Sequence, residues 1–531
     1  MLNLLLFSCA RVGAPNGGTR DSLAPKFLGS NIDTTRLNVS RTVKELRLDF
    51  DEYVMLKDFN KNFNVSPPIK KIKKVIPSNL ANKYVLIQWE DTLQANTTYN
   101  FNFGNAIVDN NESNPLPYFN FAFSTGDKID DLFVSGTVKD AMTLIKENQT
   151  AKDNKMVVGL YKAGENLDYK QKPDYITKVD EENYFELNFL PKGEFVIIAF
   201  DDENQNSVYD AGKEKVSFLK EKITLDSTSV RGLKLKLYPS KKVVKYKESK
   251  AINGGLLMTF EGNPETVEVK SLSEELKDFK VSHVKRSDSV NIWFDAEKSN
   301  LGGTVSKQVK LSYFTPTISD TISVSYKAVK EEFKLSNEAG NLIAPENNFV
   351  INTSLPIENL NTSSWKLESD SIAQDFTAKI SEKNPFKILV NSSFKPTKKY
   401  VLTIPKETVS SYYSSNDKSF QFQFEIDKPE NYGSFTAVIK NKPTAKFWVE
   451  LTNEKGEILY SQFTNASEVS FKNLKPATYI ARIRVDNNGN GFWDEADFAQ
   501  NIAAEDVYIF EKEINVRPLW EIKEDWELTN H

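Results

Sequence analysis

Histidine and cysteine are nearly absent from this sequence. The 531 residues include one cysteine, Cys9, and two histidines, His283 and His531. A Ser-His-Asp or Cys-His mechanism needs a positioned imidazole, and a Cys/His zinc site needs several such ligands. His531 is the last residue and His283 lies in a strand-like stretch, where we expect a satisfied or solvated side chain. The scarcity excludes most hydrolase and transferase chemistries and leaves only catalysis by a pair of carboxylates open.

An excess of basic residues and long apolar runs are also missing. Lysine and arginine number 68 against 73 aspartates and glutamates, and the formal net charge is -5. Without a basic stripe to bind a phosphate backbone, nucleic acid is not an expected partner. Beyond the first residues, no stretch approaches the roughly 20 apolar residues of a membrane-spanning helix. We therefore expect any membrane attachment to be made by a lipid.

Aromatic and β-branched residues are abundant, and they alternate with polar ones. The sequence holds 35 Phe and 20 Tyr, residues that favour strands. A period of two buries one sheet face and wets the other, which is typical of antiparallel sandwiches. The sequence therefore predicts an all-β protein. The alternating sets are Leu46, Leu48 and Phe50; Tyr99, Phe101 and Phe103; Leu233, Leu235 and Leu237; Phe420, Phe422, Phe424 and Ile426; and Tyr479, Ala481, Ile483 and Val485.

Two kinds of segment occur twice, in the same order. The stretch 93–99 resembles 394–400, and 190–195 resembles 474–479. A chain of this length holds roughly three to five domains, and the repeats favour five, with a strand-rich segment between the pairs. The predicted divisions are a signal-like segment at 1–9, a tether at 10–23, and domains at 24–128, 131–239, 241–335, 336–430 and 432–531.

The N-terminus carries the only cysteine directly after an apolar run. The residues Leu4 to Cys9 resemble the lipobox of bacterial lipoproteins, in which the cysteine is acylated and becomes the mature N-terminus. The resemblance implies a signal peptide ending before Cys9 and a lipid anchor on it. The alternative is an apolar chain end with an incidental cysteine.

Two of the segments resemble known domain families. Leu48 to Glu52, Ser66-Pro67-Pro68, Gly104 to Asp109 and Phe123 to Gly126 look like the bacterial Ig-like domains near the N-termini of Bacteroidetes lipoproteins. Segments 131–239 and 432–519 look like prealbumin-like (carboxypeptidase-regulatory-like) modules, through Val134 to Val138, Leu190 to Gly193 and two Asp/Asn loops. The resemblance implies tandem Ig-like and prealbumin-like sandwiches on a protein of the outer membrane, on its surface or its periplasmic face.

The two Asp/Asn loops are candidate calcium sites. Both have the spacing D-x-N-x-N-x-x-x-D, which places side-chain oxygens in the order in which a calcium loop wraps its ion. Asp and Asn are also the ordinary residues of β-turns, where they bond the local backbone, and this alternative stays open. The candidate ligands are Asp202, Asn204, Asn206 and Asp210 in the first loop, and Asp486, Asn488, Asn490, Asp494 and Asp497 in the second. In either case we expect a structural role.

Three functions are compatible with these patterns. The favoured one is a non-enzymatic, lipid-anchored scaffold of the cell envelope that binds other outer-membrane or surface proteins, as an accessory of protein assembly or secretion. The second is carbohydrate binding through exposed tryptophans, for which the candidates are Trp89, Trp365, Trp448, Trp493, Trp520 and Trp526, although Trp89 alternates with buried positions. The third, a glycosidase with two carboxylates about 5–9 Å apart, lacks a segment of the size and pattern of a common catalytic barrel.

Overall fold

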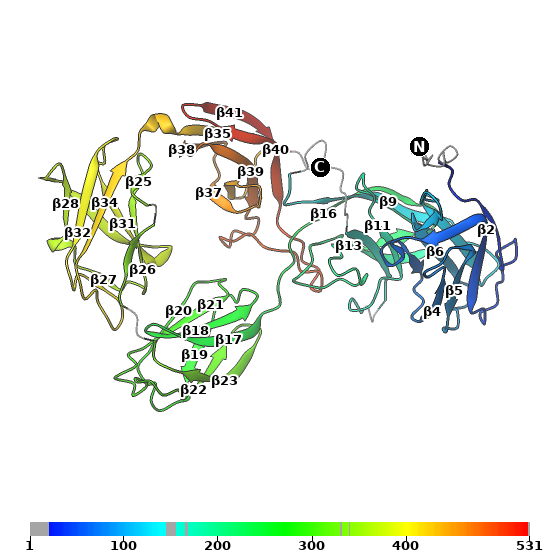
Figure 1. Ribbon diagram of the computed structural model, residues 1–531, viewed down its shortest axis with the longest axis horizontal. Helices are drawn as coiled ribbons and strands as arrows, with labels where there is room; N and C mark the ends of the chain where they lie inside the picture. The colour runs from blue at the N-terminus through cyan, green and yellow to red at the C-terminus, as the bar shows by residue number, and fades with distance from the viewer. Residues whose placement is uncertain (1–20, 145–154, 165–167, 330–331, 339, 529–531) are drawn as a thin grey trace, which may run out of the picture. The chain divides into compact units, whose positions relative to one another are not determined.

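The computed structural model describes residues 21–144, 155–164, 168–329, 332–338 and 340–528. Within these ranges the regular secondary structure is almost entirely β-strand (Figure 1). The buried apolar side chains form five clusters, one for each of five sandwiches, and Trp293 of the third sandwich packs into the cluster of the fourth. Each cluster draws side chains from two facing sheets. The predicted all-β fold of tandem sandwiches is confirmed.

The alternating residues account for these cores. Leu46, Leu48 and Phe50 are buried, and so are Leu235 and Leu237. The described stretch 272–279 holds turns and bends. One backbone hydrogen bond, from Leu276 N to Ser273 O, closes a single turn there. A single turn is too short to offset the cost of starting a helix.

The first sandwich packs the sheet β1-β2-β5-β4, with β7 beside β2, against the sheet β3-β6-β8. These strands are blue in Figure 1, and one short helix, α1, precedes β3. The bounds are β1 (Phe27–Ser30), β2 (Glu45–Leu56), α1 (Phe59–Asn62), β3 (Asn64–Ser66), β4 (Ile72–Ile76), β5 (Asn82–Trp89), β6 (Thr98–Gly104), β7 (Ile107–Asp109) and β8 (Phe119–Ser124).

The second sandwich packs the sheet β11-β10-β13-β14, with β15 beside β13, against the sheet β12-β9-β16. Its first Asp/Asn loop connects β13 to β14. The bounds are β9 (Leu132–Asp140), β10 (Met156–Lys162), β11 (Tyr175–Lys178), β12 (Tyr184–Leu190), β13 (Gly193–Asp201), β14 (Val216–Phe218), β15 (Ile223–Leu225) and β16 (Val230–Leu237).

The asparagines of β6 do not form the wetted face that the alternation predicts. Asn100 is buried, and with Asn102 it lines a small polar cavity that β11 and β12 of the second sandwich close on the other side. The backbone N–H of Ile176 donates to Ser66 Oγ across this junction, at 3.2 Å. The period of two identified the two faces correctly, but it cannot tell a solvated polar face from one covered by the next sandwich.

The third and fourth sandwiches each pair two sheets. The third has β17-β18-β21-β20 and β19-β22-β23, and the fourth has β24-β26-β31-β30 and β25-β34-β32-β28-β29, with β27 paired to β33. The bounds are β17 (Lys245–Ile252), β18 (Gly255–Glu261), β19 (Glu268–Ser271), β20 (Lys280–His283), β21 (Ser289–Trp293), β22 (Lys307–Phe314), β23 (Ser319–Tyr326), β24 (Leu335–Asn337), β25 (Leu342–Ile343), β26 (Phe349–Thr353), β27 (Asn359–Leu360), η1 (Thr362–Ser364), β28 (Lys366–Ser369), β29 (Ile372–Ala373), β30 (Phe376–Ser381), β31 (Asn384–Ser392), β32 (Lys399–Ile404), β33 (Val409–Ser410) and β34 (Phe420–Ile426).

The fifth sandwich packs the sheet β37-β36-β39-β40 against the sheet β38-β35-β41. The second Asp/Asn loop connects β39 to β40. The bounds are η2 (Pro429–Asn431), β35 (Gly433–Lys440), β36 (Phe447–Thr452), β37 (Ile458–Thr464), β38 (Glu468–Leu474), β39 (Ala477–Val485), β40 (Val507–Val516) and β41 (Glu521–Glu527).

Contacts between residues divide the chain into two compact units. Among the described residues, the first runs to Leu237 and the second from Tyr238 onward, except that 140–144 and 211–213 group with the second. The first two sandwiches thus belong to one unit and the last three to the other. The finer boundaries at 24–128, 131–239, 241–335, 336–430 and 432–531 stay a prediction. Within the described ranges, no helix is long and apolar enough to cross a membrane.

Candidate functional site

The first Asp/Asn loop follows β13 and is organised around a buried aspartate. Asp202 accepts backbone hydrogen bonds from Asn206 N through Oδ1 and from Ser207 N through Oδ2, both at 3.0 Å. Asn204 Oδ1 also accepts from Asn206 N at 3.0 Å, and Asn206 Oδ1 accepts from Val208 N at 2.6 Å. The bonds accepted by Asn204 and Asn206 come from two residues on and are Asx turns, in which a side chain stands in for a backbone carbonyl.

The second loop, after β39, repeats this framework. The buried Asp486 accepts from Asn490 N and Gly491 N, each at 3.0 Å. Asn490 Oδ1 accepts from Phe492 N at 2.8 Å. Gly491 has φ +81°, a conformation open to glycine at little cost, whereas Ser207 holds φ 62° at the matching place of the first loop. The two loops share one fold and differ in the residue at their sharpest point.

A buried glutamate closes each loop. Glu214 accepts from Glu203 N at 3.1 Å and from Asp210 N at 2.8 Å. Glu505 likewise accepts from Asn488 N at 3.1 Å and from Asp494 N at 2.9 Å. In both loops one carboxylate therefore ties the start of the loop to its end.

Asp497, the predicted closing residue of the second loop, lies elsewhere. Its carboxylate accepts from Gln500 N at 3.2 Å, and its backbone pairs with Ile502. Sequence spacing missed Glu505 because the stretch 495–504 lengthens the loop and moves its closing residue out of a twelve-residue window. The signal that could have found it is Glu214, which already lies outside the standard spacing in the first loop.

Burial raises the pKa of three loop carboxyl groups, while hydrogen bonds and a cation lower that of a fourth. Desolvation raises the pKa of Asp202 and Glu505, and it raises the pKa of Glu214 to about 7. Burial also acts on Asp494, but hydrogen bonds from Asn488 and the nearby Arg286 guanidinium outweigh it and hold its pKa below the usual range. Asp494 is the only one of these four whose pKa is lowered.

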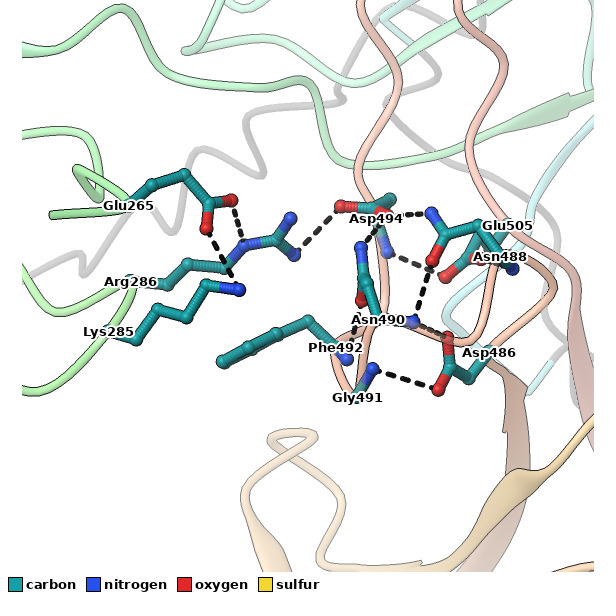
Figure 2. A network of polar contacts seen from close by, with 10 residues as sticks. All are labelled: Glu265, Lys285, Arg286, Asp486, Asn488, Asn490, Gly491, Phe492, Asp494 and Glu505. Atoms are coloured by element: carbon teal, nitrogen blue, oxygen red, sulfur yellow. Dashed lines mark hydrogen bonds and ion pairs between the residues drawn. The ribbon is translucent and has the colours of Figure 1, made fainter. Parts of the chain in front are cut away.

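Arg286, from the turn between β20 and β21, supplies that positive charge (Figure 2). Its Nη1 lies 2.8 Å from Asp494 Oδ1, and its Nε lies 2.5 Å from Glu265 Oε1. The guanidinium carbon lies 4.6 Å from the ring centroid of Phe492, a cation-π contact. The loop of the fifth sandwich is therefore held by a residue of the third sandwich, within the same compact unit.

The segment that precedes the third sandwich contacts the same loop. Ala496 N donates to Pro239 O at 3.1 Å, and Lys241 N donates to Ala496 O at 2.8 Å. The rings of Tyr238 and Trp493 lie 6.4 Å apart. The second loop is consequently a junction at which two other parts of the chain meet.

The donor set of the loops suits a hard cation chemically. All predicted ligands offer oxygens, and a carboxylate oxygen that accepts one N–H keeps a second lone pair. The amide nitrogens of Asn488 and Asn490 donate to Asp494 Oδ2, the latter at 2.8 Å, so Asp494 is shared with them and with Arg286. No group of three or more His, Cys, Asp or Glu side chains suited to a metal occurs in the described part of the chain. Calcium binding at either loop stays a prediction.

The other sequence candidates fall into different places. Trp89, as expected, is buried, and Trp365 and Trp526 are buried too, while Trp448 and Trp493 are half-buried and Trp520 is 48% exposed. The half-buried His283 has its Nε2 3.1 Å from Ser287 O, a structural contact. Cys9 and His531 lie outside the described residues.

Comparisons with known proteins identify one domain. Residues 21–125 match the family model of the bacterial Ig-like domain, which is less than half of the chain. The first sandwich is therefore a bacterial Ig-like domain, as its motifs predicted. No curated protein matches the sequence.

Solved structures similar to this chain include three surface or binding proteins. The surface layer protein SbsC, domains 1–6, is 11% identical over 93% of this chain and 67% of its own, with a TM-score of 0.16. A Bacteroides ovatus glucan-utilization protein, SGBP-B, solved with a mixed-linkage heptasaccharide, is 9% identical over 72% and 94%, with a TM-score of 0.21. The BSP domain of a biofilm associated protein is 10% identical over 95% and 99%, with a TM-score of 0.17. Overlaps this low carry no inference about what this chain binds.

Proposed function

We propose that this protein is a non-enzymatic, lipid-anchored scaffold of the cell envelope that binds other outer-membrane proteins. The observation that carries the proposal is that the polar side chains of the second Asp/Asn loop make structural contacts within the chain. Its buried carboxylates accept backbone N–H groups, and Asp494 pairs with Arg286. They hold the chain together instead of converging on an open cleft.

The Ig-like domain at 21–125 supports the same proposal, because such sandwiches present rigid surfaces and edges to partners. In the proposal Cys9 is acylated after removal of a signal peptide, 10–23 is the tether, and the second and fifth sandwiches are prealbumin-like spacers. The partners are outer-membrane proteins engaged in protein assembly or secretion. Anchoring and partner are separate parts of the proposal and need separate tests.

The anchor is tested by a Cys9→Ala variant of the full chain. We expect the parent in the membrane fraction and the variant in the soluble fraction, with a Ser8→Ala variant as the matched control that stays with the membrane. A Cys9→Ala protein that remains membrane-bound contradicts lipid anchoring.

The partner is tested by crosslinking in intact cell envelopes followed by mass spectrometry, with an unrelated lipoprotein of similar abundance as control. Recovery of the same neighbours with both proteins contradicts a specific scaffold.

The proposal includes a structural calcium ion at the loops. Asp486, Asn488, Asn490 and Asp494 would hold it in the second loop, and Asp202, Asn204, Asn206 and Asp210 in the first, where it would rigidify the hairpin. Support comes from the all-oxygen donor set and from the framework that both loops share. Isothermal titration of the full chain with calcium should give a heat of binding that Asp486→Asn removes for the second loop and Asp202→Asn for the first. Identical titrations of parent and variants contradict it.

Carbohydrate binding is the alternative, and one observation favours it. Trp520, in the turn between β40 and β41, is the exposed tryptophan among the six candidates, and an exposed indole ring can stack on a sugar. A glycan array probed with the parent and with Trp520→Ala separates the two functions. Binding that the substitution abolishes favours the alternative, and no binding by the parent removes it.

A further inference from the structure

The outer strand of one sheet in the fifth sandwich lacks the usual protection against pairing with another strand. β37 forms one edge of the sheet β37-β36-β39-β40 in the part of the chain that the structure describes (Figure 1). Its sequence, Ile-Leu-Tyr-Ser-Gln-Phe-Thr, contains no charge and no proline. Ile458, Leu459 and Phe463 are 46%, 49% and 44% exposed. The strand therefore combines open backbone groups with exposed apolar side chains.

The other described edge strands of this length are guarded. An edge strand exposes unpaired N–H and C=O groups, and proteins block them with charges, proline or a covering segment. Lysine, glutamate or aspartate lies within β4, β12, β17, β23, β30, β38, β40 and β41, and arginine and lysine lie within β16. The uncharged β8 is covered instead, because Ser124 N donates to Arg36 O at 2.8 Å and Ser124 O accepts from Val39 N at 3.0 Å. Against this background the neutral β37 is an exception.

Two exposed side chains of β37, Leu459 and Phe463, lie on one face of its sheet, where Lys446 Nζ lies 5.6 Å from the centroid of the Phe463 ring. Tyr460 points into the core, where its ring lies 5.9 Å from that of Tyr479. Because side chains alternate along a strand, Leu459 and Phe463 point to the opposite face. The Phe463 ring stacks on Trp448 of β36 with 4.4 Å between centroids. A strand added to this edge would extend the same face.

The sequence of β37 is complementary to itself when two copies run antiparallel. With a two-fold axis at Ser461, Leu459 of one copy faces Phe463 of the second copy, and Ile458 faces Thr464. Such apolar cross-strand pairs stabilise a sheet. Just outside the strand, Glu457 faces Asn465 of the second copy, so no like charges oppose each other across the contact. A two-fold contact of this kind uses the same patch on both chains.

We propose that the protein self-associates through antiparallel pairing of β37 with β37 of a second copy. The contact joins two four-stranded sheets into one continuous sheet and places Leu459 and Phe463 of both copies on one face. It goes beyond the scaffold function above, since it makes no use of the lipid anchor or of an outer-membrane partner. A few cross-strand pairs bury little surface, and we therefore expect a dimer that dissociates on dilution.

Sedimentation velocity of the full chain over a range of concentrations tests the proposal. The parent should shift from monomer to dimer as concentration rises. The variants L459K/F463K and L459E/F463E should each weaken dimerisation by at least about tenfold, because like charges then face each other across the axis. Mixing the two variants should restore the dimer, since each introduced lysine then faces an introduced glutamate of the second copy.

Two controls distinguish the loss of β37 pairing from effects of added surface charge or of misfolding. Leu519→Lys changes a residue that is also exposed but lies outside β37, and it should leave the dimer intact. Unchanged circular dichroism of all variants shows that the fold is kept. A parent that stays monomeric at every concentration overturns the proposal, as does a dimer that both double variants retain. A dimer that the double variants lose and the mixture does not restore overturns the antiparallel register.

Discussion

Glu450 is a buried carboxylate that holds two arginines. It lies on β36, with its Oε2 2.7 Å from Arg482 Nη2 and 3.1 Å from Arg484 Nε. We expect Glu450→Ala to lower the free energy of unfolding of the fifth sandwich by about 3–5 kcal/mol, because the substitution leaves the buried Arg482 without its partner. Glu468→Ala, which removes an exposed pair with Lys523, should cost no more than about 1 kcal/mol. Hydrogen exchange of β36 and β39 measures both, and equal losses of protection contradict the expectation.

The pKa of Glu214 predicts a dependence of stability on pH. Burial raises its pKa to about 7 in the folded chain, from an ordinary value of 4.5. Between these values the folded state keeps the proton that the unfolded state releases, so this contribution is fully present below about 4.5 and is lost as pH rises through 7. In calorimetry the unfolding transition of the second sandwich should fall in temperature over this range.

The matched variant for this prediction is Glu214→Gln. An amide does not titrate, so the variant should lose the part of the slope between pH 4.5 and 7 that Glu214 contributes, even if its stability is lower throughout. Identical slopes in parent and variant would show that Glu214 titrates near its ordinary value.

A single glycine sets the spacing of two strands in the second sandwich. A Cβ on Gly136 of β9 would lie 2.1 Å from Leu233 O of β16, an impossible approach to a backbone atom. Gly136→Ala must push β16 away from β9. We expect it to lower the free energy of unfolding by about 1–3 kcal/mol, as overpacking of a core does. Gly164→Ala, where nothing lies within 4 Å, should be close to neutral. Hydrogen exchange of β9 and β16 compares the two, and unchanged protection in Gly136→Ala is the contrary result.

At the scale of elements, the sequence predicts strands well and their surroundings poorly. Alternation identified β2, β6, β16, β34 and β39, because each strand carries its own pattern of buried side chains. It could not show that Asn100 is buried, since the covering strands come from another segment. Local spacing likewise found Asp486 and Asp202. It did not find Glu505, which lies in the same loop beyond the twelve-residue window, or Arg286, which reaches the loop from a distant part of the sequence. Contacts between residues that are far apart in the sequence leave no pattern in either local stretch.

At the scale of the whole molecule, the Arg286–Asp494 pair should connect the third and fifth sandwiches energetically. In a double-mutant cycle with Arg286→Ala and Asp494→Ala, we expect a coupling of about 1 kcal/mol that weakens at high salt, because both side chains are partly exposed. The exposed pair Lys440–Asp525, treated in the same way, should show about half of that or less. Hydrogen exchange of residues 486–494 gives the free energies, and additive losses at Arg286 and Asp494 would show that the pair contributes no stability.

The pairing of Ser240 with Ala496 also has a topological consequence. Everything between these two residues leaves one point of the chain and comes back to it. A protease that nicks a surface turn anywhere in that excursion would yield two bands on a denaturing gel, yet the fragments should elute together from a sizing column. For the same reason the excursion is a natural place to insert a tag or a foreign domain, since both stems stay fastened at the base.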